Sequence, residues 1–346
     1  METLLTDTVV LPDSNAATKV APGLDLKGEI ERLKREKNAV ILAHYYQDYE
    51  IQDIADFVGD SLDLSRKAAQ TDADVIVFCG VRFMSEVAKI VNPVRTVLLP
   101  DADAGCSLEE ACGAEEFKQW RDDHPDHISL TYINCSAEVK ALSDIIVTSS
   151  NAEAIINQLP EDQPILFAPD RHLGNFIKKK TDRDMVLWPG SCIVHEEFSE
   201  ELLLQLKAEH KETPVAAHPE CPDTILELAD YVGSTKGILN FVATDESKSF
   251  IIATEPHIIY QMQKDNPEKT FIAAPGVSEA RDIGACPCTH CPYMAMNSLE
   301  KLYLALVNNA PRIEMDEELR LRALKPIERM LEMSPKPSGA ASQAAE

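Results

Sequence analysis

The sequence has no long apolar run and few basic residues, and both absences narrow the classes of protein to which it can belong. Its 346 residues include 33 lysines and arginines against 58 aspartates and glutamates, a net charge of −25 at pH 7. Such an acidic chain is a poor ligand for nucleic acid or for an anionic membrane surface. No apolar segment approaches the roughly 20 residues of a membrane helix, and the N-terminus lacks the basic and apolar parts of a signal peptide. We therefore expect a cytoplasmic protein that binds neither nucleic acid nor membrane.

The glycine motifs that bind phosphate are also absent. The chain has only 13 glycines and contains neither GxGxxG nor GxxxxGK[ST], so nothing indicates a dinucleotide fold or a P-loop. Nine cysteines are present. In a chain without a secretion signal, cysteines indicate metal binding, catalysis or buried packing rather than a disulfide framework. The length allows two or three domains, each with its own core.

One pattern occurs three times along the chain. It reads AHYYQDYEIQDIADFVGDSL from position 43, TYINCSAEVKALSDIIVTSS from position 131 and AHPECPDTILELADYVGST from position 217. With Tyr46, Asn134 and Glu220 aligned, each copy has an aspartate 10 positions later and a hydroxyl residue 15 positions later. These residues are Asp56, Asp144 and Asp230, then Ser61, Ser149 and Thr235. The pattern predicts a threefold internal repeat, and its length favours three small related domains over a solenoid.

Short apolar runs alternate with helical segments in each copy, which predicts parallel strands covered by helices and an α/β fold. We expect domains at 25–113, 114–200 and 201–333, the last including C-terminal helices, with disordered tails at 1–24 and 334–346. The expected strands are 39–43, 56–61, 74–80 and 95–100; 128–134, 144–150, 165–172 and 185–190; and 215–220, 231–235, 250–256 and 270–275.

Each fourth strand ends at a proline that is soon followed by cysteine. The cysteines are Cys106, Cys192 and the group Cys286, Cys288 and Cys291. If the three domains surround a pseudo-threefold axis, these loops converge and one cysteine from each meets the others. Three thiolates without a fourth protein ligand suit an iron–sulfur cluster with one open iron better than a structural zinc, which takes four ligands. This reasoning leaves the third ligand open among the last three cysteines.

Further motifs carry a family resemblance. AHYYQ, GDSLDLS, SAEVKA, VTSSNA, WPGSCIVHEEF, AHPE, VGST and HCPYMAMN occur in this order. Over about residues 28 to 332 the chain resembles the bacterial type A quinolinate synthases. The resemblance implies three homologous αβα domains around a pseudo-threefold axis and one [4Fe-4S] cluster with three cysteine ligands and one open iron. It also implies an enzyme that condenses iminoaspartate with dihydroxyacetone phosphate to quinolinate, phosphate and water in NAD synthesis.

The resemblance assigns the cluster ligands to Cys106, Cys192 and Cys291, although this chain has CxCxxC where many members have CxxCxxC. It implies catalytic roles for Tyr46, Glu220, His44 and His195, with Glu220 and Tyr46 as the proton-transfer pair. An L-aspartate oxidase that delivers iminoaspartate is a candidate partner. The substrate-binding residues that it implies are His44, Ser61, Tyr132, Asn134, Ser149, His195, His218, Glu220 and Thr235.

The hydroxyl residues fit anionic substrates, because helix N-termini with Ser or Thr bind carboxylates and phosphates without added positive charge. The alternative for Ser61, Ser149 and Thr235 is plain helix capping. Two other functions also stay open. One is a binding protein whose three domains are held together by zinc, and the other is a thiol redox enzyme centred on the sequence CPCTHC.

Overall fold

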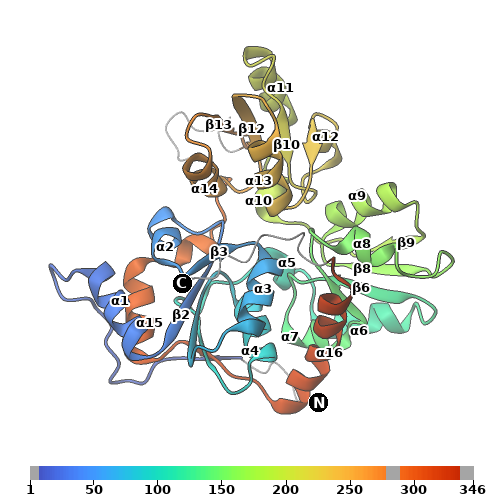
Figure 1. The fold of residues 1–346 in the computed structure, drawn as a ribbon. Coiled ribbons are helices and arrows are strands. Elements are labelled where there is room, and N and C mark those ends of the chain that lie inside the picture. The colour runs from blue at the N-terminus through green and yellow to red at the C-terminus, as the bar shows by residue number, and fades with distance from the viewer. Residues whose placement is uncertain (1–7, 278–288, 336–346) are drawn as a thin grey trace.

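The structure, a computed structural model, describes residues 8–277 and 289–335 and contains all twelve strands expected from the sequence. They form three small sheets, each the centre of one lobe of the molecule (Figure 1). All pairings among these twelve strands are parallel, which confirms the α/β fold class. The strands are β2 (Ala39–His44), β3 (Phe57–Gly59), β4 (Val75–Cys79) and β5 (Thr96–Leu98) in the first lobe; β6 (Ile128–Tyr132), β7 (Ile145–Val147), β8 (Ile165–Ala168) and β9 (Met185–Leu187) in the second; and β10 (Val215–Ala217), β11 (Tyr231–Val232), β12 (Ser249–Ala253) and β13 (Thr270–Ala273) in the third.

The three sheets share one topology. Their strand orders are β3-β2-β4-β5, β7-β6-β8-β9 and β11-β10-β12-β13, so the second strand of each repeat always lies at an edge. The inner strands are almost entirely buried, as the continuous apolar runs require of a sheet covered on both faces. Identical topology in three consecutive segments confirms the internal repeat.

Helices flank each sheet, and side chains of Asp, Ser or Asn at the preceding residue begin many of them. Asp25, Asp60 and Asp170, for example, each accept a hydrogen bond from a backbone N–H in the first helical turn. The helices are α1 (Leu26–Glu36), α2 (Tyr49–Ile54), α3 (Ser61–Gln70), α4 (Arg82–Val91) and α5 (Ser107–Glu110); α6 (Ala114–Asp122), α7 (Ala137–Leu142), α8 (Ala152–Ile156), α9 (Arg171–Thr181) and α10 (Ile193–Glu196); and α11 (Glu200–Glu209), α12 (Asp223–Leu226), α13 (Thr235–Thr244) and α14 (Ile258–Asp265).

The repeated aspartates make the same contacts in every lobe. Each stands just before the second strand and accepts a hydrogen bond from the backbone N–H of a residue in or next to the first strand, at 2.8 to 2.9 Å. Each also pairs with a basic residue of the leading helix, at 2.8 to 3.6 Å. The aspartate thus ties two strands and one helix together. The three sets are Asp56, Ile41 and Lys34; Asp144, Ser129 and Arg121; and Asp230, Val215 and Lys207.

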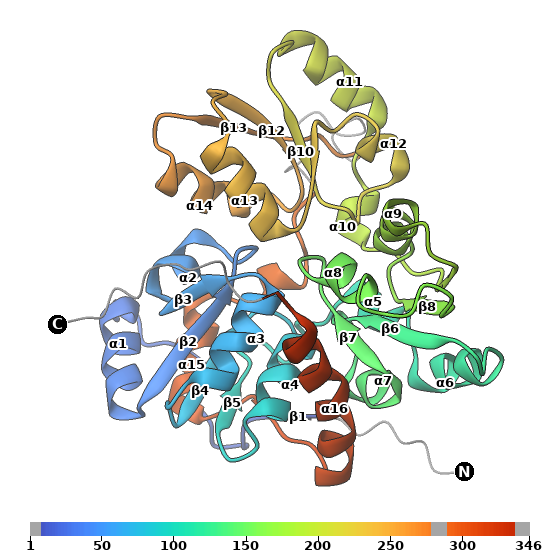
Figure 2. The ribbon, with the colours of Figure 1, turned by 45° about the vertical axis from the view of Figure 1, so that its right-hand side comes forward.

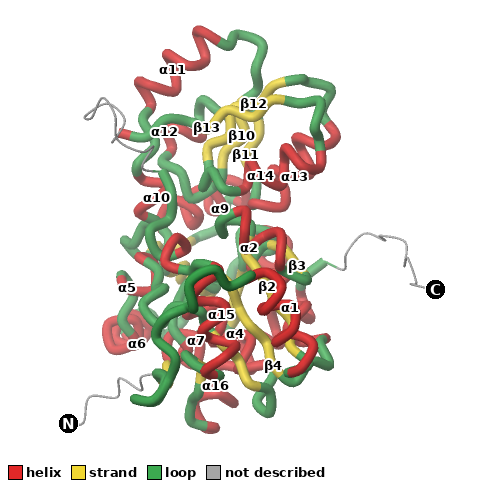
Figure 3. Tube along the Cα trace, turned by 90° about the vertical axis from the view of Figure 1, so that its left-hand side faces the viewer, coloured by secondary structure: helices red, strands yellow, loops and turns green. Residues whose placement is uncertain are grey.

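The C-terminal segment differs from expectation, because it does not belong to the third lobe. After the 3₁₀ helix η2 (Met294–Met296), α15 (Leu299–Asn308) packs against α1, and β14 (Arg312–Ile313) pairs with β5. The last helix, α16 (Glu317–Met333), lies against α4 and α7 and so bridges the first two lobes (Figure 2). Figure 3 shows the third sheet standing apart from these elements. The third domain therefore ends before η2.

The predicted tails also need correction where the structure describes them. Within 1–24, the strand β1 (Val9–Val10) pairs antiparallel with β14, and the Thr8 hydroxyl donates to buried Glu86 at 2.6 Å. At the other end, Ser334 is buried and its hydroxyl accepts from Asn151. Residues 1–7 and 336–346 lie outside the described part. No helix among the described residues is long and apolar enough to cross a bilayer.

Replacing a repeated aspartate should weaken its lobe. We expect Asp144→Ala to lower the free energy of unfolding by about 1–3 kcal/mol, because the Ser129 N–H and the Arg121 guanidinium both lose a partner. Denaturant unfolding followed by circular dichroism measures the change. Asp162→Ala, at an exposed turn, is the control and should change stability by less than about 0.5 kcal/mol. Equal effects of the two substitutions would contradict a structural role for the repeated aspartate.

Candidate active site

The central pocket lies where the carboxyl ends of the three sheets meet, and residues of all three lobes line it. This is the place where open parallel sheets bind ligands. The structure brings to this one pocket all the residues to which the resemblance assigns a role as cluster ligand, catalytic group or substrate contact. They are His44, Tyr46, Ser61 and Cys106 from the first lobe, Tyr132, Asn134, Ser149, Cys192 and His195 from the second, and His218, Glu220, Thr235 and Cys291 from the third lobe and the segment after it.

The three cysteines share one local geometry. Each directly precedes a short helical turn, and its carbonyl oxygen accepts from the N–H four residues later at 3.0 to 3.1 Å. Backbone N–H groups of that turn also point at the thiol sulfurs of Cys106, Cys192 and Cys291 and lower their pKa values. Hydrogen bonds from the backbone to sulfur stabilise thiolate and are typical of cysteines that ligate metal.

Burial nevertheless outweighs these hydrogen bonds. It raises the pKa values of Cys106 and Cys192 well above the usual value and that of Cys291 to about 11, and each thiolate would also repel the others. Three thiolates can therefore share this pocket only around a compensating positive group. A metal cluster would supply that charge, so the donor set fits one. Cys286 and Cys288, the other two cysteines of the CxCxxC motif, lie outside the described residues.

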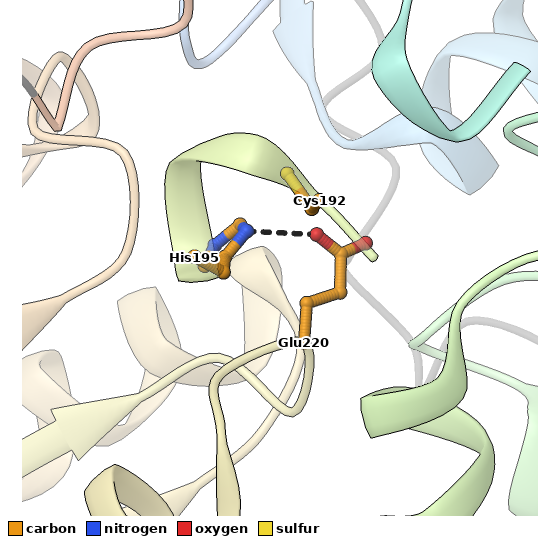
Figure 4. Close-up of side chains that lie close together, drawn as sticks. All are labelled: Cys192, His195 and Glu220. Carbon is orange, nitrogen blue, oxygen red and sulfur yellow. Dashed lines mark ion pairs between the residues drawn. The ribbon is translucent and has the colours of Figure 1, made fainter. Parts of the chain in front are cut away.

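Glu220 is the charged centre of the pocket. Its Oε2 atom lies 2.8 Å from His195 Nδ1 and 3.8 Å from His218 Nδ1, and all three side chains are almost fully buried. Burial opposes the charge of this carboxylate, but His218, His195 and the Tyr132 hydroxyl together hold its pKa below the usual value. Figure 4 shows Cys192, which directly precedes α10, and His195, which lies in that helix, with Glu220 facing both.

Two of the pocket histidines, His44 and His218, are kept neutral by burial. Burial lowers the pKa of His44 to about 4 and that of His218 to about 3, although nearby carboxylates oppose these shifts. The His218 ring stacks on that of His195 with centroids 4.9 Å apart, and its Nε2 lies 3.3 Å from the Ser149 hydroxyl. At neutral pH the imidazoles of His44 and His218 can accept or donate a hydrogen bond without carrying charge.

Thr254 is a residue that the sequence reasoning missed. Its hydroxyl lies 2.7 Å from the Tyr46 hydroxyl and 3.0 Å from His195 Nε2, and it is buried. The Tyr46 hydroxyl also contacts Thr235 at 3.0 Å. Close polar contacts therefore link Glu220 to Tyr46. Glu220 Oε2 lies 2.8 Å from His195 Nδ1, and hydrogen bonds connect His195 Nε2 through Thr254 to Tyr46.

The hydroxyl residues are not helix caps, contrary to the capping alternative for Ser61 and Thr235. Both are the first residue of a helix, and the preceding residues, Asp60 and Ser234, accept the capping hydrogen bonds. Ser149 likewise lies ahead of the residue that precedes α8. The three hydroxyls are therefore available to a ligand in the pocket, beside the first N–H groups of α3 and α13.

Two further features of the lining point to a polar ligand. Asn134 Oδ1 is buried and has no hydrogen-bond partner among the described residues, which leaves an acceptor for a ligand donor. Glu255, which was also not predicted from the sequence, directly follows Thr254 and lines the pocket. Its signal was present, since Thr254 and Glu255 directly follow the third strand of the third repeat. No lysine or arginine is among the described lining residues.

Three α/β lobes thus surround one pocket lined by thiols, imidazoles and a carboxylate, a combination suited to an enzyme with a metal centre. Residues 28–332 match the family model described as "Quinolinate synthetase A protein". The chain belongs to this family. It is 58% identical to the quinolinate synthase of Microcystis aeruginosa, covering 90% of this chain and 95% of that protein. It is 57% identical to that of Thermosynechococcus vestitus (92% and 99% covered) and 56% identical to that of Gloeothece citriformis (94% and 99%).

The low pKa of His44 predicts how stability depends on pH. Between pH 6.5 and about 4 the unfolded chain takes up a proton at this residue and the folded chain does not, so stability falls as pH falls. His44→Gln should reduce this loss by up to about 3 kcal/mol. Denaturant unfolding at pH 7 and pH 4.5 measures it, with His210→Gln, at the end of α11, as the control. A pH-dependent loss identical in the wild type and in His44→Gln would contradict the burial argument.

Proposed function

We propose that this chain is a quinolinate synthase, which condenses iminoaspartate with dihydroxyacetone phosphate to give quinolinate, phosphate and water. One observation carries the proposal beyond family membership. The three cysteines, one from each repeat, line the same pocket as the Glu220–His195 pair and the strand-end hydroxyls. The candidate metal ligands and the candidate proton-transfer residues thus line one pocket, so both can contact the same bound substrate.

Cys106, Cys192 and Cys291 would hold a [4Fe-4S] cluster in this proposal. When bound there, the cluster supplies an iron that lacks a protein ligand and can act as a Lewis acid toward a substrate oxygen. The zinc-bridged binding protein is less well supported, because a structural zinc takes four protein ligands and the described residues supply only three cysteines to this pocket.

The residues of the chain provide the acid–base chemistry. Making an aromatic ring from these substrates removes protons from carbon and delivers protons to departing oxygens. Glu220 is the group suited to take the proton, because its pKa is lowered, it is buried, and it lies beside the Tyr132 hydroxyl and 2.8 Å from His195 Nδ1. The chain through His195 and Thr254 to Tyr46 offers a route along which a proton can be returned.

The substrates carry carboxylates and a phosphate, and the pocket binds them without a cationic side chain. The Ser61 and Thr235 hydroxyls stand beside free helical N–H groups, which attract anions. Ser149 and the neutral imidazoles of His44 and His218 add hydrogen-bond partners, and Tyr132 and Asn134 orient the substrate. The proposal includes a cytoplasmic location, where reducing conditions keep ligating thiols reduced, and an L-aspartate oxidase as the source of iminoaspartate.

The cysteine assignment predicts the metal content of variants. Anaerobically purified protein should be brown, with broad absorbance near about 400 nm, and contain four irons and four sulfides per chain. Cys106→Ser, Cys192→Ser and Cys291→Ser should each lose most of the iron and the quinolinate formation. Cys79→Ala, which changes a buried thiol in β4 away from the pocket, is the matched control and should keep both.

Two other outcomes would replace the proposal. One zinc per chain, with no iron, would favour the zinc-bridged binding protein. Full activity in the three serine variants, together with its loss in Cys286→Ser or Cys288→Ser, would favour the thiol redox enzyme. Elemental analysis and a discontinuous quinolinate assay separate all three possibilities.

The role of Glu220 predicts a kinetic effect that spares the metal. Glu220→Gln keeps the shape of the side chain but removes the base, so kcat should fall by about 10²- to 10⁴-fold while iron content stays unchanged. Glu246→Gln, on an exposed loop, is the control and should leave kcat as it is. A kcat within a few-fold of the wild type would exclude Glu220 as the base.

A further inference from the structure

A second group of metal-binding side chains lies beside the central pocket. Glu255 follows β12, His257 stands just before α14, and His290 comes one residue ahead of Cys291. Glu255 Oε1 is 2.8 Å from His257 Nδ1 and 3.3 Å from His290 Nδ1, and the two Nδ1 atoms are 3.2 Å apart. Three donor atoms from two segments, the β12–α14 connection and the chain just before Cys291, therefore meet at one point.

The spacing of these atoms matches the ligand shell of a small divalent cation. Zinc binds histidine nitrogen and carboxylate oxygen at about 2.0–2.2 Å in a tetrahedral arrangement, which places neighbouring donor atoms about 3.3 Å apart. The three observed separations, 2.8, 3.2 and 3.3 Å, lie at or just below this value. Only small shifts would be needed to admit the ion.

Hydrogen bonding alone satisfies this group poorly. Both Nδ1 atoms face the same carboxylate oxygen and also each other. If both rings carried a hydrogen on Nδ1, two donors would point at one oxygen with their hydrogens crowded together. If one ring were bare, its lone pair would face the lone pairs of the carboxylate. A cation at the centre would use all three lone pairs at once.

The surroundings orient the carboxylate in the way that metal sites require. The second oxygen of Glu255 accepts from the backbone N–H of His257 at 2.9 Å, and Oε1 also accepts from the N–H of Cys291 at 3.3 Å. Such outer contacts fix a ligating carboxylate in place. The Glu255 side chain is 1% exposed, whereas those of His257 and His290 are 25% and 33% exposed. An ion can thus enter from solvent between the two partly exposed histidines and reach the buried carboxylate behind them.

We propose that Glu255, His257 and His290 form a binding site for one divalent cation of the zinc type, separate from the three cysteines. Two imidazole nitrogens and one carboxylate oxygen leave a fourth position for water. Because Glu255 Oε1 also contacts the N–H of Cys291, an ion at this site would touch the segment that carries a pocket cysteine. The site goes beyond the proposed function and does not depend on it.

Zinc binding to the full-length protein tests the proposal. Anaerobically purified protein with its iron retained is dialysed against buffered Zn²⁺ over a range of free concentrations, and zinc and iron per chain are measured by elemental analysis. The wild type should bind one zinc without losing iron. His257→Gln and His290→Gln should each raise the Kd for zinc by about 100-fold or more, since even outer-contact changes cost 10- to 100-fold.

His124→Gln is the matched control, because His124 also lies next to a second histidine, His127, with ring centroids 5.2 Å apart, but its Nδ1 contacts the carbonyl oxygen of Trp120 and not a carboxylate. It should bind zinc as the wild type does. Circular dichroism and iron content show whether each variant is folded. The proposal is overturned if the two glutamine variants bind zinc with the wild-type Kd, or if zinc enters all four proteins only as iron leaves. The wild type failing to bind zinc would overturn it as well.

Discussion

One carboxylate-to-backbone contact, made three times, sets the geometry on which the pocket depends. Asp56, Asp144 and Asp230 each join the first strand, the second strand and the leading helix of a lobe. The contact lies at the start of the strands and fixes their relative positions, so their opposite ends deliver side chains at equivalent places. A pocket assembled from three lobes needs this precision, because an error in one strand pair would displace that lobe's ligand.

The pocket manages negative charge without basic side chains, which is unusual for a site that would bind several anionic groups. Its own carboxylate, Glu220, is compensated by the neighbouring His218, His195 and Tyr132 side chains rather than by lysine or arginine. What remains for ligands is a set of oriented dipoles: helical N–H groups beside Ser61 and Thr235, and neutral imidazoles. Dipoles fixed by the fold act strongly in a buried site, and they avoid the cost of desolvating further charges.

Much of this could be predicted from the sequence, because the repeat offsets place equivalent residues at strand ends, where parallel sheets bind ligands. The strand-end residues among the thirteen meet for that reason, whereas His195 and the choice of Cys291 came from the family resemblance. Contacts without a counterpart in the repeat could not be predicted. The packing of α15 and α16 against the first two lobes depends on contacts between residues far apart in the sequence. The tail residue Thr8 contacts Glu86 because β1 adds an edge strand to the sheet of the first lobe. Capping also escaped prediction, since Asp60 and Ser61 are both good caps and the pattern cannot choose between them.

The position two residues after the third strand of each lobe carries a different side chain in each lobe, and each side chain makes different contacts. Two places beyond the last strand residues Cys79, Ala168 and Ala253 stand Val81, Asp170 and Glu255. Val81 lines the pocket, Asp170 accepts from the Leu173 N–H to begin α9, and Glu255 joins two histidines and the Cys291 backbone. Val81 and Glu255 line the pocket and Asp170 does not, so the side chain at this position has a different use in each lobe. The repeated topology thus places equivalent backbone positions in each lobe, and side chains that differ between the lobes, such as Glu255, give the three lobes different functional groups.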